Sequence, residues 1–357
     1  MPYRINKVSL PDEFDRINID LAPFHAFSPS FLRGRIARMQ ETEDTFTLSV
    51  QSGHVSTNHI TYDSAKIGGS DDRRNGQVDL IKAVAKWIPD FDAVYSIHDS
   101  PTRFISDMHL EELKELAEDG EYYDPSIEMD TSMHGWAAAC PPRSPLRSKT
   151  ASPRTAEGKS FIVSHTATMD LCQHPSVLPL HGTTAGIDPY PQGDLMPIFS
   201  LSKTKFHADI LGIPVEQWGE EKSADIVQWE TKTDKRLLWR GRNTGGYFST
   251  QTQWRNSHRA RLARMVAFDL ESEVEVLPSP GAAEGETLGN ATIEERMGKL
   301  NQLMFDIGLA YDPVQCHSDD GTCDDIRNEL VFRPVLTFDE ETNYKYILDV
   351  VSTPSTL

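Results

Sequence analysis

The chain has 357 residues, of which 38% are hydrophobic and 25% are charged, and its 54 acidic side chains outnumber its 35 basic ones to give a formal net charge of −19. This length is enough for two domains of ordinary size. The acidic balance argues against a nucleic-acid-binding protein, which usually carries a basic face. No apolar run approaches the roughly 18–20 residues of a membrane span, and the N-terminal residues lack the apolar region of a signal peptide. Taken alone, these properties predict a soluble, cytosolic protein.

The first hundred residues alternate between helix and strand patterns. Residues 29–39 place Phe31, Leu32 and Ile36 at helical spacing, whereas residues 44–50 alternate apolar and polar side chains as a strand does. The predicted elements are a helix over 29–39, a strand over 44–50, a loop over 68–76, a helix over 78–87 and a buried strand over 91–97. This rhythm of strand, helix and strand predicts a layered α/β domain.

The second half repeats this alternation after a polar interruption. Residues 141–159 are rich in proline, serine and basic residues, and we expect them to form a mobile insertion. Further elements are predicted as a strand over 196–200, a helix over 226–232, a strand over 237–239 and a basic helix over 256–270, with a loop over 278–289. A second α/β set is therefore expected.

Asp99 stands where the buried strand over 91–97 ends and a turn containing Pro101 begins. Catalytic groups favour such strand ends, and a carboxylate there can accept a proton from an attacking hydroxyl. An aspartate before Ser-Pro also caps its own turn readily. The residues alone leave both interpretations open, and the physical chemistry of the turn favours capping.

The most informative segment runs from Arg240 to Thr244, where Leu237-Leu-Trp meets Arg-Gly-Arg-Asn-Thr and then two glycines. A strand followed by a glycine-rich turn places backbone N–H groups and fixed cations at one edge of a sheet, where open α/β sheets bind anions. Arginine suits a phosphate there. A surface cluster of ion pairs is the competing interpretation.

Two other polar groups could belong to such a site. Ser200, Lys203 and Thr204 follow another predicted strand and suit a diphosphate or a sugar hydroxyl, although an exposed loop would look the same. The cluster on the basic helix is most simply a solvated face, from which one or two members could point back at the anion site. Its members are Arg255, His258, Arg259, Arg261 and Arg264.

The four cysteines are too few to define a disulfide scaffold. Cys316 and Cys323, with His317 and two aspartates between them, weakly suggest a metal loop, but a second pair of zinc ligands is missing. A local Cys316–Cys323 disulfide is favoured in an oxidising compartment and two free thiols in a reducing one. Asn290 fits a glycosylation sequon, which alone is a weak signal.

Seven short segments, taken in order, resemble the CAP10-type glycosyltransferases (family 90), particularly the fungal branch, which is related to the protein O-glucosyl- and O-xylosyltransferases. The similarity runs from about residue 14 to about residue 349. The segments are Phe46-Thr-Leu-Ser-Val50, Ile97-His-Asp-Ser-Pro-Thr-Arg103, Gly135-Trp-Ala-Ala-Ala-Cys-Pro-Pro142, Met169-Asp-Leu-Cys-Gln-His-Pro175, Pro197-Ile-Phe-Ser-Leu-Ser-Lys-Thr204, Ala208-Asp-Ile-Leu211 and Leu238-Trp-Arg-Gly-Arg-Asn-Thr-Gly-Gly246.

The resemblance implies a GT-B architecture, in which two Rossmann-like domains face each other across a cleft. It implies an acceptor-side domain over residues 1–190 and a donor domain over 191–357. Such enzymes transfer a sugar, here xylose or glucose, from a UDP donor to a hydroxyl of a glycan or protein with inversion. The implied partners are that donor and acceptor and no nucleic acid, and neither a metal nor another cofactor is implied.

The resemblance also implies roles for individual residues. Asp99 matches the proposed general base, which shifts its interpretation from capping toward catalysis. Arg242 stands where the family commonly has serine. The implied donor-binding residues are Arg240, Gly241, Arg242, Asn243, Thr244, Ser200, Lys203 and Thr204, and the implied acceptor-side residues are Arg103 and Trp136.

Two departures from the family qualify the expected activity. Family members act in the Golgi or ER lumen and carry a membrane anchor, for which this chain shows no candidate. The segment Tyr344–Asp349 matches an element that continues in the family with Asp-Gly-Asn and Ser-Gly-Arg, but here Val350 follows. An incomplete donor domain is therefore expected. The alternatives are an inactive or truncated member that binds glycan or protein, and an unrelated cytosolic phosphate-binding enzyme with free cysteines.

Overall fold

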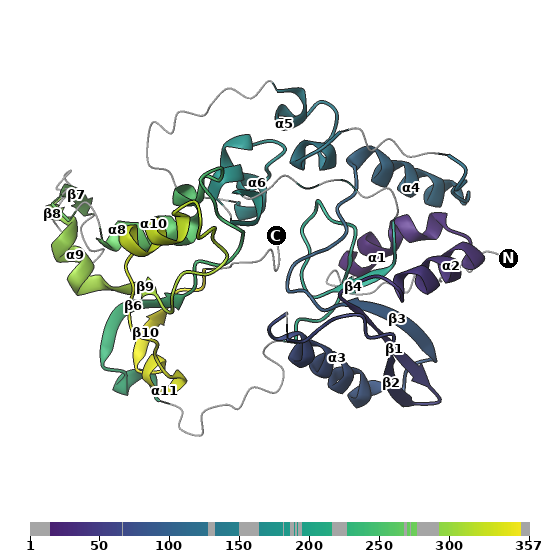
Figure 1. Cartoon of the computed structure of the whole chain (residues 1–357), viewed down its shortest axis with the longest axis horizontal. Coiled ribbons are helices and arrows are strands. Elements are labelled where there is room, and N and C mark those ends of the chain that lie inside the picture. The colour runs from purple at the N-terminus through teal and green to yellow at the C-terminus, as the bar shows by residue number, and fades with distance from the viewer. Residues whose placement is uncertain are drawn as a thin grey trace, which may run out of the picture. The chain divides into compact units, whose positions relative to one another are not determined.

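The structure is a computed structural model in which the chain divides into two compact units (Figure 1). Unit 1 comprises residues 1–177, 188–220 and 353–357, and unit 2 comprises residues 178–187 and 221–352. The structure describes residues 15–65, 67–127, 133–149, 164–180, 182–185, 189, 191, 195–215, 227–267, 270–271, 273–276 and 293–350.

Unit 1 is built on a five-stranded mixed sheet with the strand order β2-β1-β3-β4-β5. Strand β1 pairs antiparallel with both β2 and β3, whereas β3, β4 and β5 run parallel. The strands are β1 (Thr45–Gln51), β2 (His54–Asn58), β3 (Phe91–Ser96), β4 (Ile198–Ser200) and β5 (Ile210–Leu211). The antiparallel half distinguishes this sheet from the all-parallel sheet expected of a Rossmann-like domain.

Helices cover both faces of the unit 1 sheet. Neighbouring residues of β3 point to opposite faces, so that each face presents apolar side chains to a helix. Val94 packs with Met39 of α2 (Pro29–Met39), whereas Tyr95 packs on the side of α3 (Ser70–Val84). Figure 1 shows α3 on one side of the sheet and α1 and α2 on the other. The remaining helices of unit 1 are α1 (Asp15–Leu21), α4 (Asp107–Asp119), α5 (Pro145–Ser148), α6 (His165–Thr168) and the 3-10 helices Ala22–Ala26 and Trp136–Ala139, and the 3-10 helix Pro175–Leu180 spans the boundary between the two units.

Helix α3 begins eight residues before the predicted helix over 78–87, so the expected loop over 68–76 is wrong for most of its length. Gly69 precedes the helix with φ at 77°, and Asp71 and Asp72 occupy the first turn, where carboxylates complement the helix dipole. Gly76 lets the helix approach the chain after β5, since a Cβ there would come within 2.9 Å of Val215. The polar residues that suggested a loop form the first two turns of this helix, where Asp72 and Asn75 are exposed.

The expected boundary at residue 190 differs from this division. Strand β4 lies after residue 190 but hydrogen-bonds to β3 within the sheet of unit 1, and β5 extends the same sheet. Residues 195–215 therefore belong with the first unit. Of the predicted insertion over 141–159, the structure describes residues 141–149, which include the short helix α5, and the others lie outside the described residues.

Unit 2 is built on a three-stranded parallel sheet with the order β10-β6-β9. The first strand along the chain is central: β6 leads to β9 on one side, and β9 leads to β10 on the other. Helix α8 lies between β6 and β9 in sequence, and α10 between β9 and β10. The elements of unit 2 are α7 (Gly182–Ala185), the 3-10 helices Trp229–Thr231 and Trp254–Asn256, β6 (Asp234–Gly241), α8 (His258–Ala267), β7 (Glu273–Val276), β8 (Ile293–Arg296), α9 (Met297–Met304), β9 (Phe305–Leu309), α10 (Thr322–Glu329), α11 (Phe338–Glu341) and β10 (Tyr344–Ile347).

Several predictions for unit 2 need correction. The expected helix over 226–232 is a single 3-10 helix at Trp229–Thr231 in the part of that range that is described. The expected helix over 256–270 is α8, which begins at His258 and ends at Ala267. The loop over 278–289 and Asn290 lie outside the described residues. Within the described segments, no helix is both long and apolar enough to cross a bilayer.

Candidate functional site

Asp99 lies at the carboxyl edge of the unit 1 sheet, beside the loop that follows β4. Because β3 and β4 are parallel neighbours, the segments after them meet, and the Ser202 hydroxyl donates to the backbone carbonyl of Asp99 at 2.7 Å. The Asp99 side chain is 53% exposed, and its described partner is Arg73, 3.9 Å away. Within the described ranges its carboxylate accepts no hydrogen bond from the turn, so the capping interpretation finds no support.

Asp209 is a buried carboxylate that holds the Asp99 loop against β4. Its side chain is fully buried and accepts hydrogen bonds from the backbone N–H groups of Thr102 and Arg103, both at 2.8 Å. It also accepts from the Thr102 hydroxyl at 3.0 Å and the Ser200 hydroxyl at 2.5 Å. Ser200, expected to bind donor, therefore binds Asp209. Sequence reasoning missed Asp209 as a site residue, although an aspartate between Ala208 and Ile210 is a charged residue in an apolar run.

Lys203 and Thr204 are also committed to contacts within unit 1. The Lys203 ammonium lies 2.7 Å from Asp20 of α1, and their side chains are 8% and 3% exposed. Asp20 further accepts from the backbone N–H of Leu211, which ties α1 to β5. The Thr204 hydroxyl is buried 2.7 Å from Nδ1 of His207. The structure thus places both expected donor residues in the interior of unit 1.

Trp136 and Arg103, the expected acceptor-side residues, lie close to this buried network. Trp136 is buried and packs edge-to-face against Phe104 and His207. Burial lowers the pKa of the Arg103 guanidinium, and the charge of Asp209 opposes that shift. The backbone carbonyl of Arg103 accepts from Ala208 at 2.7 Å. Arg103 is thus tied by its backbone to Asp209 and Ala208, and Trp136 packs on the neighbouring Phe104.

The stability of unit 1 is expected to fall as the pH is lowered from about 6.5 to about 4, because of His207. Burial lowers the pKa of His207 to about 4, with Asp209 raising it and Lys203 lowering it further. An unfolded histidine titrates near 6.5, so the unfolded chain binds the extra proton first and gains stability as the pH falls through that window. Chemical denaturation of the wild type and of His207→Phe between pH 7 and pH 4 measures this. A slope that is equal in both proteins would contradict it.

In unit 2, Arg240 lies in β6, and its side chain contacts other residues of the same unit. Its guanidinium pairs with the Asp306 carboxylate of β9 at 2.7 Å and donates to the carbonyls of Asp306 at 2.8 Å and Pro334 at 3.1 Å. Burial raises the pKa of Asp306, but hydrogen bonds from Tyr344 and Arg240 bring it below its ordinary value. The ion-pair interpretation of the arginine cluster therefore describes Arg240, whose side chain is 8% exposed.

The loop that follows β6 is held to the loop that follows β9. Gly241 ends the strand where a Cβ would come within 2.8 Å of the Trp239 ring. Asn243 is buried and makes two hydrogen bonds with the backbone of Val314, donating to its carbonyl and accepting from its N–H at 2.9 Å. Arg242 is exposed, and its guanidinium carbon lies 4.1 Å from the centre of the Tyr311 ring. Arg242 is thus the arginine of this turn that faces solvent.

Arg259 of α8 joins the segments that follow β6 and β10. It donates to the Arg242 carbonyl at 3.0 Å, to the Thr244 hydroxyl at 2.9 Å and to the Val350 carbonyl at 2.8 Å. Burial lowers its pKa to about 10, and the charge of Asp349 opposes the shift. Of the basic cluster on this helix, Arg259 thus reaches the turn that was expected to bind an anion, whereas Arg255 pairs with Asp325 and Glu329 on α10.

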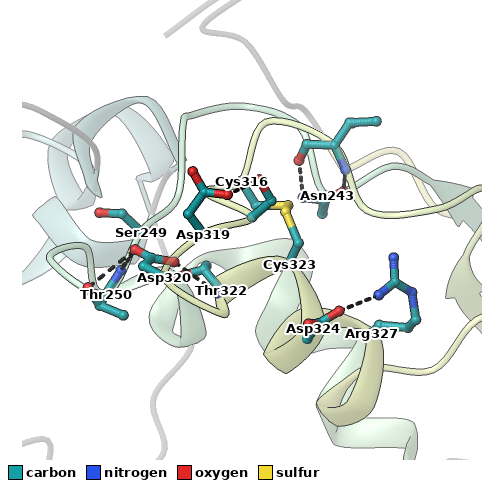
Figure 2. Close-up of a disulfide and its surroundings, with 12 residues drawn as sticks. Asn243, Ser249, Thr250, Cys316, Asp319, Asp320, Thr322, Cys323, Asp324 and Arg327 are labelled. Carbon is teal, nitrogen blue, oxygen red and sulfur yellow. Dashed lines mark hydrogen bonds and ion pairs between the residues drawn. A yellow bond between two sulfur atoms is a disulfide. The ribbon is translucent and has the colours of Figure 1, made fainter.

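The Cys316–Cys323 disulfide joins the segment after β9 to the first turn of α10 (Figure 2). Asp320 of the enclosed segment accepts from the backbone N–H groups of Thr250 and Thr322, both at 2.9 Å. All cysteines are paired, since Cys140 and Cys172 form the other disulfide. The Cys316–Cys323 pair is therefore a disulfide and no thiolate metal ligand, and the described residues contain no group of three or more side chains suited to a metal ion.

Comparison with protein-family models, curated proteins and solved structures finds no match to this chain. Its function is therefore inferred from its residues and their geometry.

Proposed function

We propose that this protein is a UDP-sugar-dependent glycosyltransferase that transfers xylose or glucose to a hydroxyl of a glycan or protein. The observation that carries this proposal is the site at the carboxyl edge of the unit 2 sheet. There the chain leaves the central strand β6 toward one neighbour and returns on the other side as β10. In open α/β sheets, such a switch point is where nucleotides bind.

Two arginines supply positive charge at this switch point. Arg242 is exposed at the turn after β6, and Arg259 lies where that turn meets the segment after β10. Two glycines follow Thr244, and Gly245 has φ at 112°, which suits a close approach of ligand to backbone. A departing diphosphate is stabilised by arginines and by backbone N–H groups. Arg240 supports this edge from within the sheet, and no metal or other cofactor enters the proposal.

The proposed base is Asp99 of unit 1. Its carboxylate takes the proton of the acceptor hydroxyl, whose oxygen then bonds to the anomeric carbon as the bond from that carbon to the diphosphate breaks and UDP leaves. A GT-B arrangement, in which the two units bind acceptor and donor, accommodates this division of roles. Both disulfides support a place in the secretory pathway, since such bonds persist in oxidising compartments.

Replacing Arg242 with alanine is expected to weaken UDP binding about 10- to 150-fold, because a hydrogen bond to a charged group contributes about 1.5–3 kcal/mol. The fold is expected to remain intact, since Arg242 is exposed. The matched control is Arg255→Ala, which removes an exposed arginine from the same unit that pairs with Asp325 instead. Calorimetry with UDP measures both affinities.

Equal affinity in the wild type and Arg242→Ala would place the diphosphate elsewhere. Arg240→Ala distinguishes support from contact: because it leaves Asp306 with a weakened set of partners, it is expected to lower the melting temperature of the chain. UDP affinity without sugar transfer would favour a binding module over an enzyme.

A further inference from the structure

The loop that follows β9 lies where nucleotide-binding βαβ units hold the nucleoside. In such units the glycine-rich turn after the first strand holds the phosphates, and an acidic residue at the end of the second strand binds the ribose. Here β6, α8 and β9 are the first strand, the helix and the second strand, with β6 and β9 parallel neighbours. The segment after β9 begins Ala310-Tyr311-Asp312.

Tyr311 offers a ring at this point. It is 51% exposed, and the Arg242 guanidinium lies over its ring. The two residues are brought together by the sheet, since the Ala310 N–H donates to the Gly241 carbonyl at 2.8 Å. A half-exposed ring with a cation above it is a surface on which bases stack, and base stacking on aromatic side chains is largely independent of base identity.

The backbone of this loop is strained at two residues. Tyr311 has φ at 73° and Gln315 has φ at 51°, values that residues other than glycine rarely adopt. Surrounding contacts impose the conformation: Asn243 binds Val314, and the side-chain oxygen of Gln315 accepts from the N–H of Gly245 at 3.2 Å. Strain that is maintained in this way is typical of ligand-binding loops.

Asp312 completes the arrangement. It follows Tyr311 directly and is exposed, and its carboxylate makes no hydrogen bond or ion pair with the rest of the described chain. A carboxylate at the end of the second strand is the group that accepts hydrogen bonds from ribose hydroxyls in βαβ nucleotide sites.

We propose that the Tyr311 ring stacks the base of the nucleoside diphosphate whose phosphates Arg242 binds, and that Asp312 accepts hydrogen bonds from its ribose. This assignment rests on the proposed donor site of unit 2 and adds the residues that bind the nucleoside as distinct from the diphosphate. It separates Tyr311, which contacts the base alone, from Arg259, which lies on the phosphate side.

The test compares UDP with inorganic pyrophosphate, which has the phosphates but no nucleoside. In calorimetry on the full chain, Tyr311→Ala is expected to weaken UDP binding about 5- to 100-fold and to leave pyrophosphate binding unchanged. Tyr311→Phe keeps the ring and is expected to retain UDP affinity. Tyr346→Ala is the matched control, since Tyr346 is 52% exposed in the same unit but lies within β10.

A second variant separates ring loss from loop strain. Tyr311→Gly relieves the positive φ as it removes the ring, and it is expected to weaken UDP binding as Tyr311→Ala does. Unchanged UDP affinity in both variants overturns the assignment, as does an equal loss for UDP and pyrophosphate. If the wild-type chain binds UDP no more tightly than pyrophosphate, the nucleoside assignment is overturned, and the anion site is retained. A folded chain that binds neither overturns the proposed function itself.

Discussion

Replacing Asp209 with alanine is expected to lower the free energy of unfolding by about 3–5 kcal/mol, because it leaves a set of buried donors without their acceptor. The donors are the backbone N–H groups of Thr102 and Arg103 and the hydroxyls of Thr102 and Ser200. The Asp209 side chain is fully buried, so water does not replace it without opening the structure. Thermal and urea unfolding of the full chain measure the loss.

The control for this variant is Asp92→Ala. Asp92 lies on β3 of the same sheet but is exposed, so its replacement is expected to change stability by about 0.5 kcal/mol or less. Equal unfolding midpoints for Asp209→Ala and Asp92→Ala would contradict the role given to the buried network. Because Asp209 also positions the segment after Asp99, sugar transfer by any folded Asp209 variant is expected to fall as well.

Replacing Asp99 with asparagine is expected to lower kcat for sugar transfer about 10²- to 10⁴-fold, because the variant lacks the proposed general base for the acceptor hydroxyl. UDP affinity is expected to stay unchanged, since the proposed donor site belongs to unit 2. Stability is expected to change little, because the carboxylate is half exposed and its described partner, Arg73, is 3.9 Å away. Initial rates with UDP-xylose and UDP-glucose, together with calorimetry and a melting curve, separate these three properties.

The effects of replacing Asp99 on stability and on the transfer rate distinguish a general base from a turn cap. A cap would reduce stability and leave the rate of the folded fraction intact, whereas a base reduces the rate alone. A variant that transfers sugar at the wild-type rate would exclude Asp99 as the base. Asp92→Asn, which alters an exposed carboxylate on β3, the strand that precedes Asp99, is the control for the loss of one negative charge.

Local periodicity was sufficient for the elements that bury one regular face. Phe31, Leu32 and Ile36 correctly predict α2, and the apolar run over 91–97 predicts β3 and hence the position of Asp99 at a strand end. Helix α3 shows the limit of such patterns. Its first half is polar and contains Gly76, and the close approach of that glycine to Val215, far along the chain, is a contact that no local pattern shows.

The chemistry of the candidate site was less predictable, because it depends on partners distant in sequence. Arg240 and Arg242 flank the same glycine, yet Arg240 meets Asp306, 66 residues away, and is buried, whereas Arg242 faces solvent. Lys203 likewise meets Asp20, 183 residues away. No local pattern distinguishes a cation that binds a carboxylate of its own chain from one that is available to a ligand.

Strand order has the same dependence on distant residues. Strands β4 and β5 are short, and the pairing of β4 with β3 and of β5 with β4 assigns Ser200, Lys203 and Thr204 to unit 1 instead of the expected donor domain. The switch point of unit 2 follows from β10 pairing beside β6, which the segment Tyr344–Asp349 does not indicate by composition. The expected donor turn was found at a sheet edge, but its arginines have different roles.

Titration of UDP into the folded full chain is the direct test of a nucleoside diphosphate site at the carboxyl edge of the unit 2 sheet. We expect saturable binding of one UDP per chain, weakened in Arg242→Ala and retained in Asp99→Asn. A chain with an intact melting transition that gives no saturable heat with UDP would contradict it.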